Sequence, residues 1–304
     1  METYVKSKKD NLKLSVAYFE PTKKPVGVVQ ILHGMEEHKE RYYDFMKYLN
    51  KFGYITVIHD HRGHGKSVIQ KEDNGYFYEE SGTFIVEDAH QITEFIKEKY
   101  KDLPIYLFAH SMGAFVGRIY IQKYDKDIKK LILSGAPSNN NASTMGLLLT
   151  KIIKLFKGDR YRSKLLEYLS IGSYQRAIQK KGLKGSWVST KSKTVLDYNK
   201  DQLCGKNFTT NGYINLMHLI INTYNKKLYK VQNKNLPIKF FNGGDDPVLV
   251  NEKLQKQRID FLKEIGYKNV SEKVYPGLRH EILNEVDNQI VYKDILDYIK
   301  NSYN

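Results

Sequence analysis

The sequence predicts an α/β fold, in which a mostly parallel central sheet carries helices on both faces. Short apolar runs alternate with amphipathic stretches toward both ends of the chain, as strands and helices do in such folds. A long, basic, helical stretch interrupts this alternation. The 304 residues, of which 41% are hydrophobic and 27% charged, suit a globular protein and exclude a collagen-like, coiled-coil or disordered chain.

Each strand is predicted from a short apolar run, and each helix from apolar residues at helical spacing. Residues 12–19 alternate between polar and apolar side chains and predict a first, antiparallel strand. Residues 26–32 (VGVVQIL) are typical of a buried parallel strand. The remaining strands are predicted at 54–58, 105–108, 131–133, 237–241 and 271–275. The helices are predicted at 41–52, 86–100, 112–124, 251–265 and 286–298.

The alternation of strands and helices stops after Pro137 and resumes at Pro237. The residues between them form basic amphipathic helices and polar loops instead. We therefore predict that residues 1–137 and 236–304 form one core, and that residues 138–235 are a helical insertion that covers it as a lid.

Most of the net charge of the chain lies in this insertion. The whole chain carries +15, and residues 138–235 hold 18 Lys and Arg against four acidic residues, a balance of +14. Such a difference marks a unit with its own partner. Nucleic acid is excluded as that partner, because only three of the 18 cations are Arg and no nucleic-acid-binding module is recognisable.

The cysteine count and the hydropathy predict a cytoplasmic protein. Cys204 is the single cysteine, so no disulfide can form within the chain. No run approaches the ~18 apolar residues of a transmembrane helix. The N-terminal stretch also lacks the apolar block of a signal peptide.

A nucleophile is predicted where residues 109–113 (AHSMG) join a strand to a helix. In the G-x-S-x-G nucleophile elbow, a sharp turn exposes a serine hydroxyl above the sheet. Ser111 takes the serine position and Gly113 the second glycine position, whereas Ala109 replaces the first glycine. A serine that only caps the helix is the alternative interpretation.

A serine nucleophile needs a base, and the base needs an acid that orients it. In this architecture the chain order is serine, acid, histidine. His280 is the favoured base because His218, the other histidine beyond Ser111, lies in an apolar helical stretch. Asp246 is the favoured acid because it follows the strand before His280, and the adjacent Asp245 remains the alternative.

Two backbone N–H groups are predicted to bind the negative charge that develops on the substrate oxygen. One belongs to Met112, directly after the nucleophile, and the other to Met35, in the loop after the second predicted strand. Gly34, which follows His33, is expected to let the backbone turn so that the Met35 N–H faces the site. A salt-bridged supporting turn is expected from the next charged residues, Glu36, Glu37, His38 and Arg41.

Two other motifs are rejected. Residues 60–67 (DHRGHGKS) end like a phosphate-binding P-loop, but that loop needs glycine where Asp60 stands. The histidines of residues 59–64 (HDHRGH) have the spacing of a zinc-hydrolase loop, but glycine stands where its acid is expected. We therefore predict neither a metal nor an organic cofactor.

Together the motifs resemble the monoacylglycerol lipase and lysophospholipase branch of the α/β-hydrolase superfamily. They are residues 33–42 (HGMEEHKERY), 60–67 (DHRGHGKS), 109–113 (AHSMG), 243–248 (GGDDPV) and 280–281 (HE). Residues 186–189 (SWVS) and 201–204 (DQLC) are similar to the end of the lid in bacterial members. The chain departs from the family pattern at Ala109, in place of glycine, and at Gln202, in place of proline.

The resemblance implies a serine hydrolase with an α/β-hydrolase fold and a lid. Its expected substrate is a monoacylglycerol or a lysophospholipid, cleaved through Ser111, His280 and Asp246 with an acyl-enzyme intermediate and no cofactor. A short-chain carboxylesterase or an aminopeptidase-like amidase with the same three residues is the alternative. A non-catalytic binding protein of this fold is the alternative from another class.

Residues 145–157 (MGLLLTKIIKLFK) predict an amphipathic helix in the insertion. Its apolar face comprises Met145, Leu148, Leu149, Ile152, Ile153 and Phe156, and its lysines are Lys151, Lys154 and Lys157. One interpretation packs the apolar face on the core. The other is peripheral contact with an anionic membrane, with the apolar face in the bilayer and the lysines at the head groups.

Overall fold

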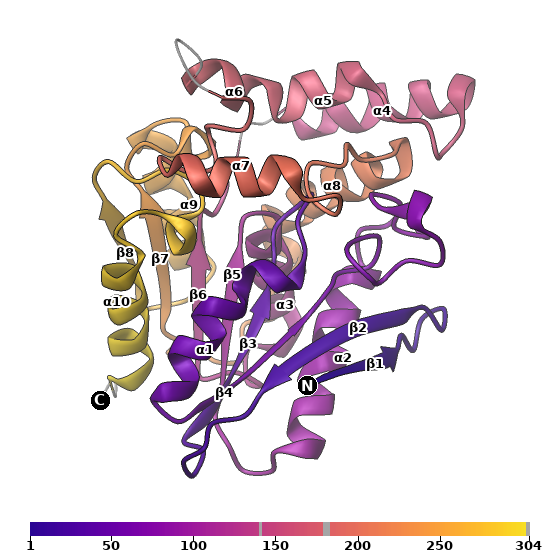
Figure 1. Cartoon of the computed structure of the whole chain (residues 1–304). Coiled ribbons are helices and arrows are strands. Elements are labelled where there is room, and N and C mark those ends of the chain that lie inside the picture. Colours follow the sequence, from indigo (N-terminus) through magenta and orange to yellow (C-terminus); the bar gives the residue numbers. More distant parts are fainter. Residues whose placement is uncertain (140–141, 179–182, 302–304) are drawn as a thin grey trace.

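A computed structural model describes residues 1–139, 142–178 and 183–301 (Figure 1). At its centre is a sheet of eight strands. They are β1 (Glu2–Lys6), β2 (Lys13–Phe19), β3 (Gly27–Leu32), β4 (Tyr54–His59), β5 (Ile105–His110), β6 (Lys130–Ser134), β7 (Ile238–Gly243) and β8 (Val270–Tyr275). Their spatial order is β1-β2-β4-β3-β5-β6-β7-β8. The pairs β1–β2 and β2–β4 are antiparallel and the others parallel, which confirms the predicted, mostly parallel sheet.

Helices cover both faces of this sheet (Figure 1). They are α1 (Tyr43–Lys51), α2 (Phe84–Lys99), α3 (Met112–Tyr124), α9 (Glu252–Glu264) and α10 (Asn288–Lys300). Successive strand residues point to opposite faces of a sheet. In β5, Leu107 is therefore buried in a core with α2, α3 and α9, whereas Phe108 is buried in a second core with α1 and α10.

The segment between β6 and β7 is helical and lies across one edge of the sheet (Figure 1). Its helices are α4 (Ser143–Lys157), α5 (Lys164–Ser170), α6 (Gly172–Ile178), α7 (Ser192–Lys200) and α8 (Thr210–Thr223). α8 packs against α3 of the core and against α4. Parallel strands bring their carboxyl ends to one edge of a sheet. The loops after β3, β5, β7 and β8 therefore meet beneath these helices.

Short 3₁₀ helices occupy several loops. They are η1 (Lys39–Tyr42), η2 (Lys71–Asp73), η3 (Lys226–Leu228), η4 (Pro247–Leu249) and η5 (Ile282–Asn284). η1 takes the place of the first turn of the helix predicted at 41–52, so α1 begins only at Tyr43. The last helix, predicted from residue 286, begins at Asn288 for a similar reason, because η5 and a turn precede it.

Strand β1 is not predicted from the sequence. It lies at the edge of the sheet, where β2 is its partner, and its side chains alternate between exposed and half-buried. An edge strand of this kind carries charged residues and buries little apolar surface. The short, charged sequence ETYVK therefore gives no apolar run from which a strand is predicted.

Candidate active site

Ser111 lies on a sharp turn between β5 and α3. Its φ of 53° is in the left-handed region, which few residues other than glycine adopt. Its N–H donates to the carbonyl oxygen of Ser134, 2.9 Å away. A Cβ atom on Gly113 would lie 2.4 Å from the Leu32 carbonyl oxygen, so only glycine fits there. This strained strand-turn-helix geometry matches the nucleophile elbow expected from the sequence.

His280 connects the serine to an aspartate. Its Nε2 atom lies 2.9 Å from the Ser111 Oγ, and its Nδ1 atom lies 2.8 Å from Asp246 Oδ2. The other carboxylate oxygen of Asp246 accepts the Val248 N–H at 2.9 Å. Asp245, in contrast, is exposed to solvent. The structure thus brings together Ser111, His280 and Asp246, which come from the loops after β5, β8 and β7.

The surroundings of His280 control its protonation. Burial alone would lower its pKa, but the Asp246 carboxylate, assisted by Glu281 and Glu37, raises it above the ordinary value. The ring of His110 lies 4.7 Å from the His280 ring, centre to centre. Burial and the neighbouring His280 hold the pKa of His110 well below the usual range, so His110 is neutral. Of these two imidazoles, His280 is therefore the one that accepts a proton more readily.

The loop after β3 lies against Ser111 and is held by carboxylates. Glu37 Oε1 accepts the Gly34 N–H at 2.5 Å and the Tyr42 hydroxyl at 2.7 Å. Arg41 bridges Glu37 and Glu281. Of the expected salt-bridged turn, the pair Glu37–Arg41 is present, and Arg41 also reaches Glu281, which follows His280. His38 pairs instead with Asp201, outside the turn, and Oε1 of the buried Glu36 has no hydrogen-bond partner among the described residues.

The reason for glycine at position 34 differs from the prediction. The positive φ of this loop, 56°, belongs to Glu36 and not to Gly34. Gly34 is needed for space, because a Cβ atom there would lie 2.7 Å from Glu37 Oε1 and 3.0 Å from the Ser111 Cβ. His33 holds this loop in place through both of its ring nitrogens. Its Nδ1 atom lies 2.7 Å from the Gly34 carbonyl oxygen, and its Nε2 atom accepts the His61 N–H at 2.9 Å.

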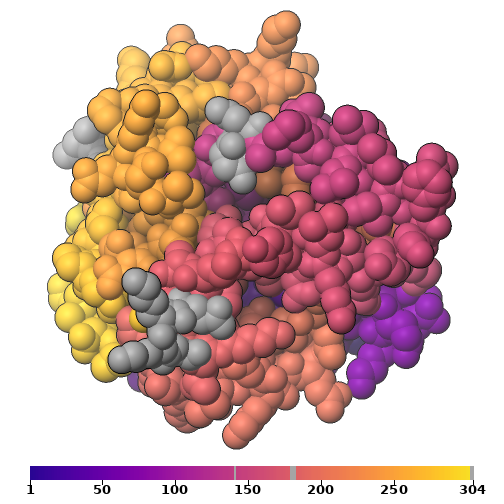
Figure 2. Space-filling view, turned by 90° about the horizontal axis from the view of Figure 1, so that it is seen from above, coloured from indigo at the N-terminus to yellow at the C-terminus, as the bar shows by residue number. Residues whose placement is uncertain are grey.

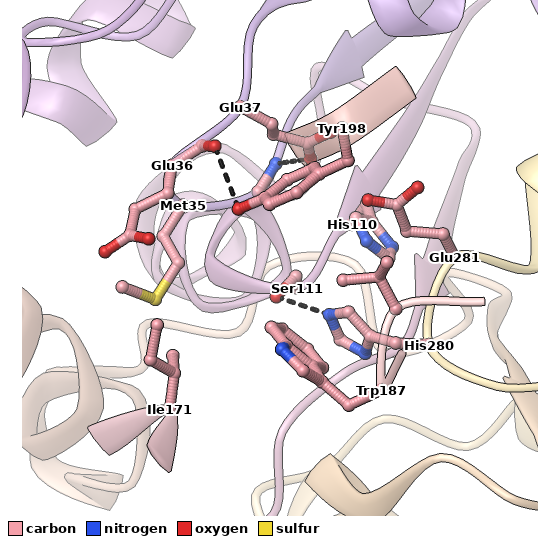
Figure 3. A pocket seen from close by; sticks show the side chains of 12 residues that line it. Met35, Glu36, Glu37, His110, Ser111, Ile171, Trp187, Tyr198, His280 and Glu281 are labelled. Atoms are coloured by element: carbon pink, nitrogen blue, oxygen red, sulfur yellow. Dashed lines mark hydrogen bonds between the residues drawn. The ribbon is translucent and has the colours of Figure 1, made fainter. Parts of the chain in front are cut away.

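A cavity opens onto the Ser111 hydroxyl (Figure 3). The core contributes the loops after β3, β5 and β8, and the helical segment contributes Ile171, Trp187, Val188 and Tyr198. The Trp187 ring lies 5.0 Å from the His280 ring. Sequence reasoning assigned no role to these four residues. The fragment SWVS was noticed only for its resemblance to a lid, and nothing in it indicates contact with a histidine 93 positions later.

Most residues of the two rejected motifs are buried at the end of β4 and in the turn that follows it. Asp60 accepts hydrogen bonds from the backbone N–H groups of Lys39 and Lys66, at 2.8 and 2.9 Å, and so closes a turn. His59, His61 and His64 are buried, and among the described residues they belong to no metal-binding cluster. His218 is half-buried in α8 and does not line the cavity at Ser111.

The chain is similar in sequence to known hydrolases. The family described as "Serine aminopeptidase, S33" matches residues 23–287. A monoacylglycerol lipase of Mycolicibacterium smegmatis is 24% identical over 282 residues, which cover 92% of this chain and 90% of that protein. A probable lysophospholipase L2 of Haemophilus influenzae is 27% identical over 321 residues, covering 98% and 90%.

Solved structures give the same result. A carboxyl esterase from Bacillus coagulans, in complex with glycerol, is 26% identical, with a TM-score of 0.87 over 98% of this chain and 97% of that chain. The resemblance to monoacylglycerol lipases and lysophospholipases is thereby confirmed. The chain is an ester hydrolase with the α/β-hydrolase fold, and it belongs to the serine aminopeptidase S33 family.

Proposed function

We propose that the protein hydrolyses lipid monoesters, either monoacylglycerols or lysophospholipids, with Ser111 as nucleophile, His280 as general base and Asp246 as the orienting acid. One observation carries this proposal: the continuous line of hydrogen bonds from Ser111 Oγ through both ring nitrogens of His280 to Asp246, at 2.9 and 2.8 Å. A serine becomes a competent nucleophile when a base oriented by an acid takes its proton.

The reaction proceeds in two steps. Ser111 Oγ attacks the ester carbonyl carbon while its proton passes to His280 Nε2. Asp246 stabilises the imidazolium, and His280 then donates the proton to the departing alcohol oxygen, which leaves an acyl group on Ser111. A water molecule, deprotonated by His280, attacks the acyl carbon and releases the fatty acid.

The oxyanion of each tetrahedral intermediate is bound by the N–H groups of Met35 and Met112. Met112 is proposed because it is the first residue of α3. N–H groups in the first turn of a helix have no partner within the helix, so this N–H can bind the oxyanion. Met35 is proposed as the second donor because its loop lies against Ser111. A Gly34→Ala variant tests the second donor, since the added Cβ pushes this loop away from Ser111. Turnover should fall at least tenfold, and a folded variant with normal turnover would place the donor elsewhere.

The triad is tested with a fluorophosphonate probe, which labels an activated serine covalently. Wild-type protein should be labelled, whereas Ser111→Ala should not be labelled and should lose more than ~1000-fold of its hydrolysis rate. Ser138→Ala is the matched control, because Ser138 is also buried near the site but donates to the Leu249 carbonyl oxygen. Absence of labelling in the wild type would indicate a binding protein.

The substrate class is tested separately with a panel of monoacylglycerols, lysophospholipids, short p-nitrophenyl esters and aminoacyl amides. We expect the highest kcat/KM for the lipid monoesters. If the protein is labelled by the probe but prefers amides or short esters, the proposed triad would stand and the proposed lipid substrate would be wrong. The panel includes aminoacyl amides because the family that the chain matches is described as an aminopeptidase family.

We also propose that residues 138–235 act as a lid that rests on an anionic lipid surface. Support comes from α4, whose predicted apolar face is divided. Leu149 and Ile153 of this face pack against the core, whereas its other four apolar side chains are exposed, as is Leu155 outside it. The exposed side chains are Met145, Leu148, Ile152, Leu155 and Phe156, with exposed fractions between 47% and 80%. Figure 2 shows the face of the molecule on which α4 lies.

The same face continues onto α5, where Leu165, Tyr168 and Leu169 are half exposed. Among the described residues no helix has the length and apolar character to cross a bilayer. Contact with lipid would therefore be made by this surface. Exposed apolar side chains beside a basic segment suit the head-group region of an anionic membrane.

Vesicle sedimentation tests the lid. The protein should sediment with anionic vesicles at low salt, less at high salt, and less with zwitterionic vesicles. Leu148→Gln with Phe156→Gln should weaken sedimentation but spare a short p-nitrophenyl ester. Ile290→Gln, an exposed apolar residue on α10, is the matched control. Equal binding to both kinds of vesicle, or no binding at low salt, would leave the lid without a membrane role.

A further inference from the structure

Three potential metal ligands meet where the helical segment contacts the loop after β3. His38 follows the loop that carries Met35, while Asp201 and Cys204 follow α7. Each offers one ligand atom, and these atoms lie within 4.8 Å of one another. His38 and Cys204 are almost completely buried, and Asp201 is one-third exposed. Side chains more than 160 residues apart in the sequence thus converge on one point.

The donor set suits zinc. Imidazole nitrogen, thiolate sulfur and carboxylate oxygen are its usual protein ligands, at about 2.0 to 2.3 Å in tetrahedral geometry. His38 Nε2 and Asp201 Oδ2 are joined by a hydrogen bond of 2.8 Å. An ion would replace the proton of this hydrogen bond and the proton of the thiol. Three protein ligands leave a fourth position for water.

The charges around the three ligands favour a cation. The guanidinium of Arg41, 4.0 Å from the Cys204 Sγ, is shared by the carboxylates of Glu37 and Glu281. Its charge is therefore already balanced, and the carboxylate of Asp201 adds a further negative charge. A groove lined by His38, Arg41 and Asp201 opens to solvent beside the ligands and provides a path for an ion.

We propose that His38, Asp201 and Cys204 form a binding site for a divalent zinc-type ion, which fastens the helical segment to the loop that carries Met35. The ion takes no part in bond breaking at Ser111. The connection is short. The Tyr198 hydroxyl donates to the Glu36 carbonyl oxygen at 3.2 Å (Figure 3). The Gly205 N–H donates to the same oxygen at 2.9 Å. Bound metal would therefore stiffen the loop beside the nucleophile.

Cobalt(II) is the direct probe, because a thiolate ligand gives it a near-ultraviolet charge-transfer band and tetrahedral geometry gives strong visible bands. Wild-type protein should show both at one equivalent of Co²⁺, and Zn²⁺ should displace the cobalt. Zn²⁺ should also raise the melting temperature. Each variant is compared with its own metal-free form, and circular dichroism verifies that it is folded.

Cys204→Ser should abolish the charge-transfer band and weaken Zn²⁺ binding at least 100-fold, and His38→Gln should weaken binding similarly. His90→Gln is the matched control. It lies in the other cluster that could bind a metal, with Glu94 and Asp127, where Lys97 already pairs with both acids. No thiolate band, or equal Zn²⁺ binding by Cys204→Ser, overturns the proposal. Loss of binding in His90→Gln would assign the metal to that surface cluster.

Discussion

The Cβ atom of Ala109 lies directly against Gly117. A Cβ atom added to Gly117 would lie 3.0 Å from it, closer than such atoms normally approach. Ala109 is the last residue but one of β5, and Gly117 is one turn into α3. The chain carries alanine where the elbow pattern has glycine, and the missing side chain of Gly117 provides the space for it.

Gly117→Ala should therefore destabilise the protein by about 1–3 kcal/mol, the usual cost of overpacking a core. Helix propensity alone predicts the opposite, a gain of about 1 kcal/mol. Ala109→Gly combined with Gly117→Ala should recover part of the loss, because it removes the opposing Cβ. Urea unfolding measures the free energy of unfolding of the wild type, the single variant and the double variant. A Gly117→Ala variant more stable than the wild type would contradict the steric argument.

Asp246→Asn should reduce kcat by roughly four orders of magnitude, because an amide no longer stabilises the imidazolium and favours the wrong tautomer of His280. Asp245→Asn is the matched control on the adjacent residue, which is exposed, and should stay within about threefold of the wild type. Steady-state kinetics on one ester substrate decides between them. If Asp245→Asn is the more damaging change, the acid has been assigned to the wrong residue.

The pH dependence should follow the charges around His280. With His280 as the proposed general base, hydrolysis requires its neutral imidazole, so kcat/KM should rise with pH through its raised pKa. Glu281→Gln removes one of the carboxylates that raise this pKa and leaves Arg41 less neutralised, and both changes disfavour the imidazolium. The acidic limb should therefore move to lower pH. Glu264→Gln, at an exposed ion pair with Lys226, should not move it. A shift to higher pH would contradict the electrostatic argument.

Glu285 is hydrogen-bonded to the loop that carries His280. Its fully buried carboxylate accepts hydrogen bonds from the Ser189 hydroxyl, the Thr190 N–H and the Arg279 N–H at 2.8 to 2.9 Å. It thereby joins the loop of His280 to the segment that carries Trp187. Glu285→Gln directs an amide N–H₂ group at some of these donors, so the two segments should separate.

We expect kcat and the rate of fluorophosphonate labelling to fall about tenfold in Glu285→Gln, with a smaller change in KM. Ser189→Ala, which removes one of the donors, should have a milder effect of the same kind. A loss of thermal stability with unchanged labelling rate would mean that Glu285 is structural only.

Buried histidines should make the protein sensitive to acid. Burial lowers the pKa of His59 to about 3 and that of His64 to about 4. Unfolded histidine binds a proton near pH 6.5. The unfolded chain therefore binds more protons below pH 6.5, and stability falls as the pH drops from there toward 4, by about 1.4 kcal/mol per pH unit for each histidine.

His59→Leu tests this directly, because neither ring nitrogen of His59 has a hydrogen-bond partner among the described residues that the substitution would remove. The free energy of unfolding, measured with urea, should decline less steeply between pH 6.5 and 4 in the variant than in the wild type. The difference in slope should correspond to one bound proton. Parallel declines in the two proteins would show that His59 is protonated in the folded state.

The sequence by itself determined the fold class, the order of the parallel strands along the chain and the loops that carry Ser111 and His280. These depend on local patterns: an apolar run of a few residues predicts a buried strand, and a glycine two positions after a serine permits a sharp turn. Once the sheet is parallel, its topology gathers the loops that follow the strands at one edge. The candidate site was therefore predictable from motifs without any knowledge of side-chain contacts.

Only the tertiary structure decided which side chains face one another. It placed Asp246 rather than Asp245 against His280, divided the apolar face of α4 and brought Trp187 to the His280 ring. It also brought Cys204 to His38. These relationships arise from the packing of segments that lie far apart in the chain. Packing depends on the shape and volume of both partners at once, and no local pattern in either segment contains that information.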